Sequence, residues 1–241
     1  DFHLRRRPVV AHLQPWDGAD EYLLELASQH AATSALIIND NFGALACALH
    51  RLQPVSWSDS YTAHLPLGSL GLHFRSHESD FSRQPVGYFQ VDPQRVWAVR
   101  SQLAREADEI IVGVSWSSSS PEHGEMRSLD LQALCSALNF PMVRFVNLQY
   151  GDVSRDLAAL DASVRGRIFV CPEIDNLRDL DGLAALMCNC DLIVTVGNTT
   201  AHLAGALGLK AWVLLPFSPS WRWMSSGSQT PWYPALRLYR Q

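Results

Sequence analysis

Lysine is almost missing from this sequence of 241 residues: Lys210 is the single example, so arginine carries nearly all of the positive charge. Acidic residues outnumber basic ones, and the formal net charge is −5. An acidic balance argues against broad electrostatic binding to nucleic acid or to an anionic membrane surface. Arginine favours planar, bidentate contacts with phosphate or carboxylate groups. The composition therefore excludes a generally basic surface and leaves local arginine contacts open.

Cysteine is also scarce, with five residues at irregular spacing. An odd count without a repeated spacing is atypical of a secreted disulfide framework. One residue separates Cys188 from Cys190, unlike the paired spacing of a zinc site, so we expect buried, unreactive thiols and no metal. No apolar run approaches the roughly 20 residues that cross a bilayer, and no signal-peptide pattern is present. We therefore expect a cytoplasmic protein without a transmembrane segment.

Several catalytic signatures are missing as well. The sequence contains no nucleophile elbow, metal-binding triad, Walker loop or dinucleotide fingerprint. Its composition is that of an ordinary globular protein, 47% hydrophobic and 18% charged, long enough for one large domain or two smaller ones. Any chemistry must therefore be sought in the loops of the fold.

Strands and helices alternate from residue 92 onward. Asp92 and Pro93 are typical of a helix start, and we expect this helix to end near Arg105. Its predicted apolar side is Val96, Trp97, Val99 and Leu103. After this helix, strands are predicted at 110–116, 143–148, 168–170, 192–196 and 211–215. Helices are predicted between and after them, at 130–139, 152–161, 180–188 and 201–207. This alternation predicts an α/β fold with a Rossmann-like, doubly wound, mainly parallel sheet.

Residues 191–208 form the most informative unit of this pattern. A β-branched run is followed by turn and cap residues, with Asn198 or Thr199 as the helix cap and Gly208 as its C-terminal stop. A strand that leads into a helix N-terminus leaves unpaired N–H groups and a partial positive charge. This arrangement predicts an anion site, most often for phosphate. The alternative is an ordinary strand–turn–helix unit without a ligand.

Polar loops follow the predicted strands, and parallel sheets bind ligands at that edge. The loops are 117–126, 149–152, 172–175 and 197–200.

We expect His202 and His123 to act in catalysis. The alternative for His202 is a histidine packed on the sheet, and the alternative for His123 is a plain loop residue. Glu173 and Asp175 either bind ribose or base, or cap helices. Trp221, Trp223, Trp232 and Tyr233 either stack on a ligand or, as we favour, pack the C-terminal tail. The predicted ligand-binding residues are Gln149, Glu173, Asp175, Gly197, Asn198, Thr199 and Thr200.

Residues 10–63 resemble the N-terminal domain of ribosomal-RNA guanine-N2 methyltransferases. The resemblance rests on Leu13-Gln14-Pro15-Trp16-Asp17, on Leu36-Ile37-Ile38-Asn39-Asp40-Asn41-Phe42-Gly43 and on Ser58-Asp59-Ser60-Tyr61. It implies a small N-terminal α/β segment. The glycine-rich cofactor turn and the Asn-Pro-Pro motif of that family are missing, so no methyltransferase activity is implied.

Residues 64–241 resemble the C-terminal part of bacterial tetratricopeptide-repeat-linked glycosyltransferases, which are similar in fold to heptosyltransferases. The motifs include Phe145-Val146-Asn147-Leu148-Gln149-Tyr150-Gly151-Asp152, Asn198-Thr199-Thr200-Ala201-His202-Leu203-Ala204-Gly205 and Pro231-Trp232-Tyr233-Pro234. The resemblance implies the GT-B architecture and a nucleoside-diphosphate sugar as donor substrate. It also implies that residues 198–200 hold the diphosphate without a metal. Two departures stand out: serines fill 117–120 where relatives have basic residues, and Gly197 replaces a common serine or aspartate.

Three segments are therefore predicted: a methyltransferase-like segment at 1–63, a connector at 64–95 and a nucleotide-sugar-binding domain at 96–241. The function we favour is metal-independent transfer of a sugar to the hydroxyl of a saccharide or protein acceptor, without a cofactor. In GT-B enzymes an N-terminal domain presents the acceptor, and residues 1–63 stand in its place. Two alternatives stay open, a non-catalytic nucleotide-binding or interaction module and a remnant of an rRNA-binding methyltransferase. Nucleic acid is the partner that the acidic charge disfavours most.

Overall fold

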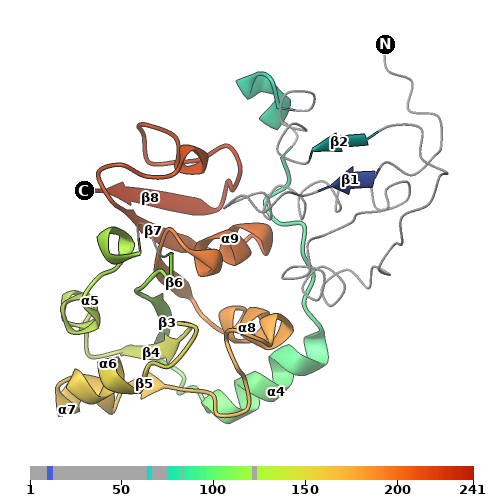
Figure 1. Ribbon diagram of the computed structural model, residues 1–241. Helices are drawn as coiled ribbons and strands as arrows, with labels where there is room; N and C mark the ends of the chain where they lie inside the picture. The colour runs from blue at the N-terminus through green and yellow to red at the C-terminus, as the bar shows by residue number, and fades with distance from the viewer. Residues whose placement is uncertain (1–9, 13–63, 67–74, 83, 121–123) are drawn as a thin grey trace. The chain divides into compact units, whose positions relative to one another are not determined.

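The computed structural model describes residues 10–12, 64–66, 75–82, 84–120 and 124–241 (Figure 1). The chain divides into two units, Asp1–Arg83 and Gln84–Gln241, and the division falls inside the predicted connector. In the first unit β1 (Val10–His12) pairs in parallel with β2 (His64–Pro66), and a 3-10 turn, η2, spans Glu78–Phe81. The remaining predictions for residues 1–63 lie outside the described residues.

The second unit is built on a six-stranded sheet in which all strands are parallel, in the order β5-β4-β3-β6-β7-β8. This order confirms the predicted doubly wound α/β fold. From β3 the chain adds β4 and β5 on one side of the sheet, and it then adds β6, β7 and β8 on the other side, so the order of the strands reverses between β3 and β6. These two strands pair from Val112↔Leu192 to Ser115↔Thr195. The strands are β3 (Ile110–Ser115), β4 (Val143–Asn147), β5 (Ile168–Phe169), β6 (Leu192–Val196), β7 (Ala211–Leu215) and β8 (Leu236–Arg240).

Helices cover both faces of this sheet, as Figure 1 shows. On one face lie α5 (Leu131–Ala137), α6 (Ser154–Ala159) and α7 (Ala162–Arg165), whose apolar residues share a core with Val112, Phe145 and Val194. On the other face α8 (Leu180–Met187) packs against both α4 (Pro93–Leu103) and α9 (Thr199–Ala206). Two 3-10 turns, η3 (Glu125–Arg127) and η4 (Trp221–Trp223), lie in the loops. No helix in the described residues is long and apolar enough to cross a membrane.

Capping residues define the helix ends. Asp92 accepts a hydrogen bond from the N–H of Gln94, with Pro93 as the first helical residue, as predicted. Asn198 caps α9 by accepting from the N–H of Thr200 at 3.0 Å. Gly208 follows that helix with φ of +69°, a left-handed conformation that favours glycine. The strand–turn–helix unit predicted at 191–208 is therefore confirmed in its structure, with α9 beginning at Thr199.

Three details of the predicted pattern were wrong. Trp97 is 71% exposed because α4 buries Val99 and Leu103, one turn apart, and position 97 points away from them. The helix predicted at 152–161 is shorter, because α6 ends at Ala159 and Leu160 has extended backbone; a separate helix, α7, follows after its N-cap Asp161 and was not predicted. The strand β8 was missed, although Leu236 and Leu238 are buried and alternate with exposed Arg237 and Tyr239.

Candidate functional site

The parallel strands β3 and β6 end side by side at the point where strand order reverses, the usual ligand position in an open α/β sheet. Residues 117–120 follow β3, and residues 197–200 connect β6 to α9. Both segments were among the predicted ligand loops. The arrangement of their polar groups therefore decides what this edge of the sheet can bind.

Asn198 bonds these two segments together. Its side chain is buried, and its Oδ1 accepts from the N–H of Thr200 and from Thr195 Oγ1, both at 3.0 Å. Its Nδ2 donates to Ser115 Oγ at 2.8 Å and to the carbonyl of Ser117 at 2.9 Å. An amide suits this position because it supplies an acceptor and two donors at once. Asn198 thus caps α9 and fixes it to the end of β3.

Gln149 extends the same network to β4. Its buried Oε1 accepts from Ser115 Oγ at 3.0 Å and from the N–H groups of Trp116 and Ser117 at 2.9 Å each. The main-chain N–H of Gln149 donates to Asn147 Oδ1 at 3.0 Å. The side chain therefore holds the loop after β3 in shape, and a direct ligand contact by Gln149 stays a prediction.

Two donors at the start of α9 have no protein partner among the described residues. Thr199 is exposed, and its main-chain N–H donates to no described group. Thr200 is fully buried, and its Oγ1 makes no hydrogen bond within the described part of the chain. Buried hydroxyls are normally paired, so such an atom calls for a bound group. Both threonines were predicted ligand contacts, and both lie in the first turn of α9, at the helix end that favours anions.

His202 lies one turn into α9 and is held by two aromatic side chains. Its ring stacks on Trp223 with centroids 4.6 Å apart and an interplanar angle of 21°. Its Nδ1 lies 3.2 Å from the hydroxyl of Tyr233. Tyr233 can approach α9 because residue 205 is glycine: a Cβ there would lie 2.2 Å from Tyr233 Cδ1. The second histidine predicted in catalysis, His123, lies outside the described residues.

The two acidic candidates bond elsewhere. Glu173 accepts from Gln102 of α4 at 2.7 Å, and Asp175 accepts from the N–H groups of Leu177 and Arg178 in its own turn. Neither carboxylate is bonded to residues 197–200, and their contact with a ligand stays a prediction. Sequence reasoning missed Asn176, whose Nδ2 donates to the carbonyls of Asn147 and Gln149 at 3.1 Å each. No sequence signal separates this asparagine from an ordinary turn residue.

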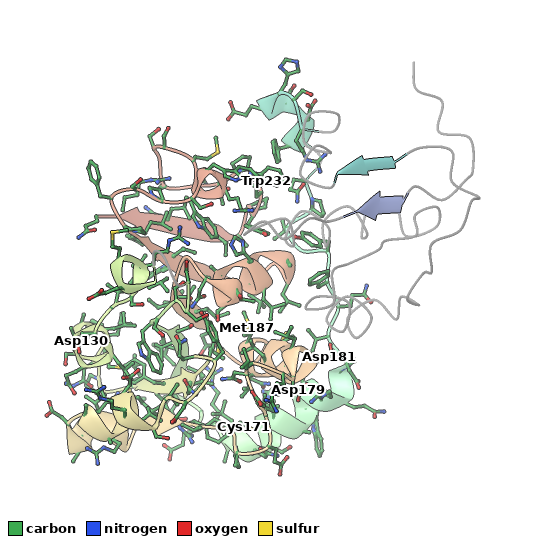
Figure 2. The ribbon with its side chains drawn as sticks, in the orientation of Figure 1. Asp130, Cys171, Asp179, Asp181, Met187 and Trp232 are labelled. Carbon is green, nitrogen blue, oxygen red and sulfur yellow. The ribbon has the colours of Figure 1, made fainter. Side chains whose placement is uncertain are left out.

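One ion pair lies at the start of α8. Arg95 of α4 contacts both carboxylate oxygens of Asp179, at 2.9 and 2.5 Å. Figure 2 shows Asp179 at the start of α8, beside α4. Partial burial opposes ionisation of this carboxyl, but hydrogen bonds from Arg95 and from the N–H of Gly182 lower the pKa of Asp179 overall. The pair therefore fixes α4 against α8.

Comparisons with known proteins match parts of this chain. Residues 1–69 match the family model described as the RLMG N-terminal domain. Ribosomal RNA large subunit methyltransferase G of Cronobacter sakazakii is 53% identical over 57 residues, 24% of this chain and 15% of that protein. Protein FlbA of Caulobacter vibrioides is 34% identical over 154 residues, 63% of this chain and 25% of that protein. The chain thus spans a quarter or less of the length of these relatives.

Solved structures also resemble this chain in fold. The E. coli ADP-heptose lipopolysaccharide heptosyltransferase II aligns with a TM-score of 0.58 and 13% identity, covering 96% of this chain and 90% of that one. A glycosyl transferase family 9 structure from Veillonella parvula aligns with a TM-score of 0.52 and 13% identity, covering 95% and 69%. Both resemblances stated from the sequence are thus confirmed, the first by the family model and the second by the fold.

Proposed function

We propose that this chain binds a nucleoside-diphosphate sugar at the N-terminus of α9 and takes part in transferring its sugar to an acceptor hydroxyl without a metal ion. The observation that carries the proposal is the pair of donors without a described partner, Thr199 N–H and Thr200 Oγ1, at the point where the order of the strands along the chain reverses. The fold likeness to glycosyltransferases supports the reaction class.

Sugar transfer places new negative charge at the position these donors surround. The bond from the sugar C1 to the diphosphate breaks, and its electron pair moves to the phosphate oxygen. The acceptor oxygen forms the new bond to C1 while its proton passes to a general base. Donors that are already in place stabilise the developing charge with little reorganisation, and a helix N-terminus contributes about 0.3–1 kcal/mol. His202, held by Trp223 and Tyr233, is the catalytic side chain we propose on α9.

Residues 117–120 affect how tightly the protein is expected to bind the diphosphate. They are serines, so this described part of the site offers no cationic side chain to the diphosphate. A hydrogen bond to a charged group typically contributes about 1.5–3 kcal/mol. Without a cation in this loop, binding is expected to be weaker than in relatives with basic residues there. Nucleotides therefore need to be tested at millimolar concentration.

A thermal-shift screen with UDP, GDP and ADP tests the proposal, because a ligand that binds the native state raises its melting temperature. We expect one of the three to stabilise the protein, and its sugar conjugate to be consumed in the presence of an acceptor. UMP, GMP and AMP serve as matched controls that lack the second phosphate. The absence of stabilisation by any of these nucleotides or their sugars contradicts the proposal.

The neutral serine loop also favours a second candidate, a nucleotide-binding module without catalysis. Stabilisation by nucleotide combined with an unchanged donor sugar, across saccharide and protein acceptors, would favour this module. Sugar transfer that is lost in His202→Ala, while nucleotide binding remains, would exclude it. The same pair of measurements therefore separates the two functions.

A further inference from the structure

We infer that the indole N–H of Trp223 donates a hydrogen bond to a phosphate oxygen of the ligand at α9, and that Gly197 keeps this donor accessible. The inference rests on the proposed nucleotide site and adds a residue to it from the C-terminal tail. The sequence placed Trp223 in an aromatic cluster that we expected to pack the tail. In addition to this packing, we assign the indole N–H of Trp223 to ligand binding.

The indole of Trp223 presents its nitrogen to the turn before α9. A Cβ built on Gly197 would lie 3.0 Å from Trp223 Nε1 and 3.7 Å from Cδ1. The nearest parts of the ring are therefore the N–H group and the carbon beside it. Gly197 itself is half-buried and is the first residue after β6. The donor thus stands beside the turn whose threonines lack partners.

This N–H group has no acceptor in the described part of the protein, although the side chain is only 2% exposed. Buried indole N–H groups usually find a partner. Trp116, equally buried, shows the usual case: its Nε1 donates to Asp156 Oδ2 at 2.8 Å. Trp223 Nε1 is not among the fully enclosed atoms without a partner, so this N–H keeps an edge that an acceptor from outside the chain can reach. This open donor is an observation independent of the helix end.

One contact holds the ring of Trp223, and another holds its main chain. One face stacks on His202, and the main-chain carbonyl of Trp223 accepts from the guanidinium of Arg240 on β8. The same guanidinium donates to the carbonyls of Gly227 at 2.8 Å and Met224 at 3.1 Å. Arg240 is thus a positioning residue for the loop that carries Trp223. A donor fixed in this way loses little entropy when a ligand binds.

A phosphate oxygen is the acceptor that fits best. The donors gathered here are the N–H of Thr199, the hydroxyl of Thr200 and the indole N–H, all neutral. A phosphate bound beside residues 197–200 would accept from these neutral donors rather than from a cation. This would offset part of the positive charge missing from residues 117–120.

Indole ¹⁵N–¹H spectra of the wild-type protein test the inference directly. The eight tryptophans each give one side-chain signal, and the Trp223 signal is identified by its loss in Trp223→Phe. UDP, GDP and ADP are titrated, and the nucleotide that binds is used for all variants. We expect the Trp223 signal to shift downfield in a saturable manner. We also expect Trp223→Phe to weaken binding about tenfold, as for a hydrogen bond to a charged group.

Two further variants make the test specific. Trp221→Phe removes an indole from the same 3-10 turn and should bind as wild type does. Gly197→Ala places a methyl group against Nε1 and should weaken binding while leaving the Trp223 signal unresponsive. A wild-type protein that binds nucleotide while its Trp223 signal stays unmoved overturns the inference and leaves the proposed function intact. Failure of the wild type to bind any of the three overturns both.

Discussion

Asn198 Nδ2 lies 2.8 Å from Ser115 Oγ, so the cap of α9 is hydrogen-bonded to the end of the neighbouring strand. The two residues are far apart in the sequence and meet because β3 and β6 pair in parallel. Ser115 in turn donates to Gln149 after β4. Three strand ends are therefore joined by one buried polar network, which holds the first turn of α9 in a defined position.

Replacing Asn198 by aspartate should reveal the importance of the donor side of this network. Asn198→Asp keeps the acceptor for Thr200 but loses both Nδ2 bonds and directs a buried carboxylate at the carbonyl of Ser117. We expect a loss of about 2–4 kcal/mol in the free energy of unfolding, measured by urea denaturation. Asn139→Asp is the control, because that exposed side chain accepts from Arg167 through an oxygen that aspartate retains. Equal stability of Asn198→Asp and wild type would contradict this assignment.

Gly205→Ala should displace Tyr233 from α9. The added Cβ would overlap the Tyr233 ring, which contacts His202 through its hydroxyl. Overpacking of this kind typically costs about 1–3 kcal/mol, so the melting temperature should fall by several degrees. Gly166→Ala is the matched control, because its Cβ would meet one carbonyl oxygen at an ordinary 3.4 Å. A melting temperature of Gly205→Ala equal to that of the control would refute the tight contact.

The pair formed by Arg95 and Asp179 should make stability depend on pH. The pKa of Asp179 is lowered in the folded protein, so its ionised form contributes stability above the ordinary aspartate pKa near 3.9. That contribution is lost as the pH falls through the folded pKa. Asp179→Asn should therefore be less stable than wild type at pH 7, by about 1 kcal/mol for this partly exposed pair, and the difference should shrink toward pH 3. Asp108→Asn, at an exposed position, is the control and should be about as stable as wild type at pH 7.

The buried thiol of Cys135 should resist modification. Burial raises its pKa to about 11, and the side chain is fully inaccessible to solvent. Because the thiolate is the reactive form, iodoacetamide at pH 8 should leave Cys135 unmodified in the native protein and label it in guanidinium. Mass spectrometry of the Cys135 peptide measures the extent of labelling in the native protein and in guanidinium. Labelling at equal rates in the two conditions would show that this part of the core opens readily.

The parts of the fold that depend on local sequence were predicted correctly. The strand at 192–196, the cap at Asn198 and the glycine stop at 208 all follow from neighbouring residues. β8 was missed because its two buried leucines form too short an alternation in a tail rich in proline and aromatic residues. Trp97 was misplaced because it is one residue from Val96, and adjacent helical positions point in different directions.

The site was only partly predictable, because most of its contacts join distant segments. Sequence alone placed Gln149 at a strand end, yet its three acceptor contacts involve Ser115, Trp116 and Ser117. The same limit applies to Trp223, whose ring stacks on His202 and whose main-chain carbonyl accepts from Arg240. The helix end at Asn198 was predictable because its cap is local. What surrounds it depends on the pairing of β3 with β6.

The central claim is that the donors at the start of α9 bind a nucleotide, and Thr200→Val tests it most directly. Valine keeps the shape of threonine and removes a buried hydroxyl that has no partner among the described residues. The variant should therefore be as stable as wild type, or slightly more so. Isothermal titration with the nucleotide that stabilises the wild type should show binding weakened about tenfold in Thr200→Val. Equal affinity in the two proteins, or no binding by the wild type, would contradict the account.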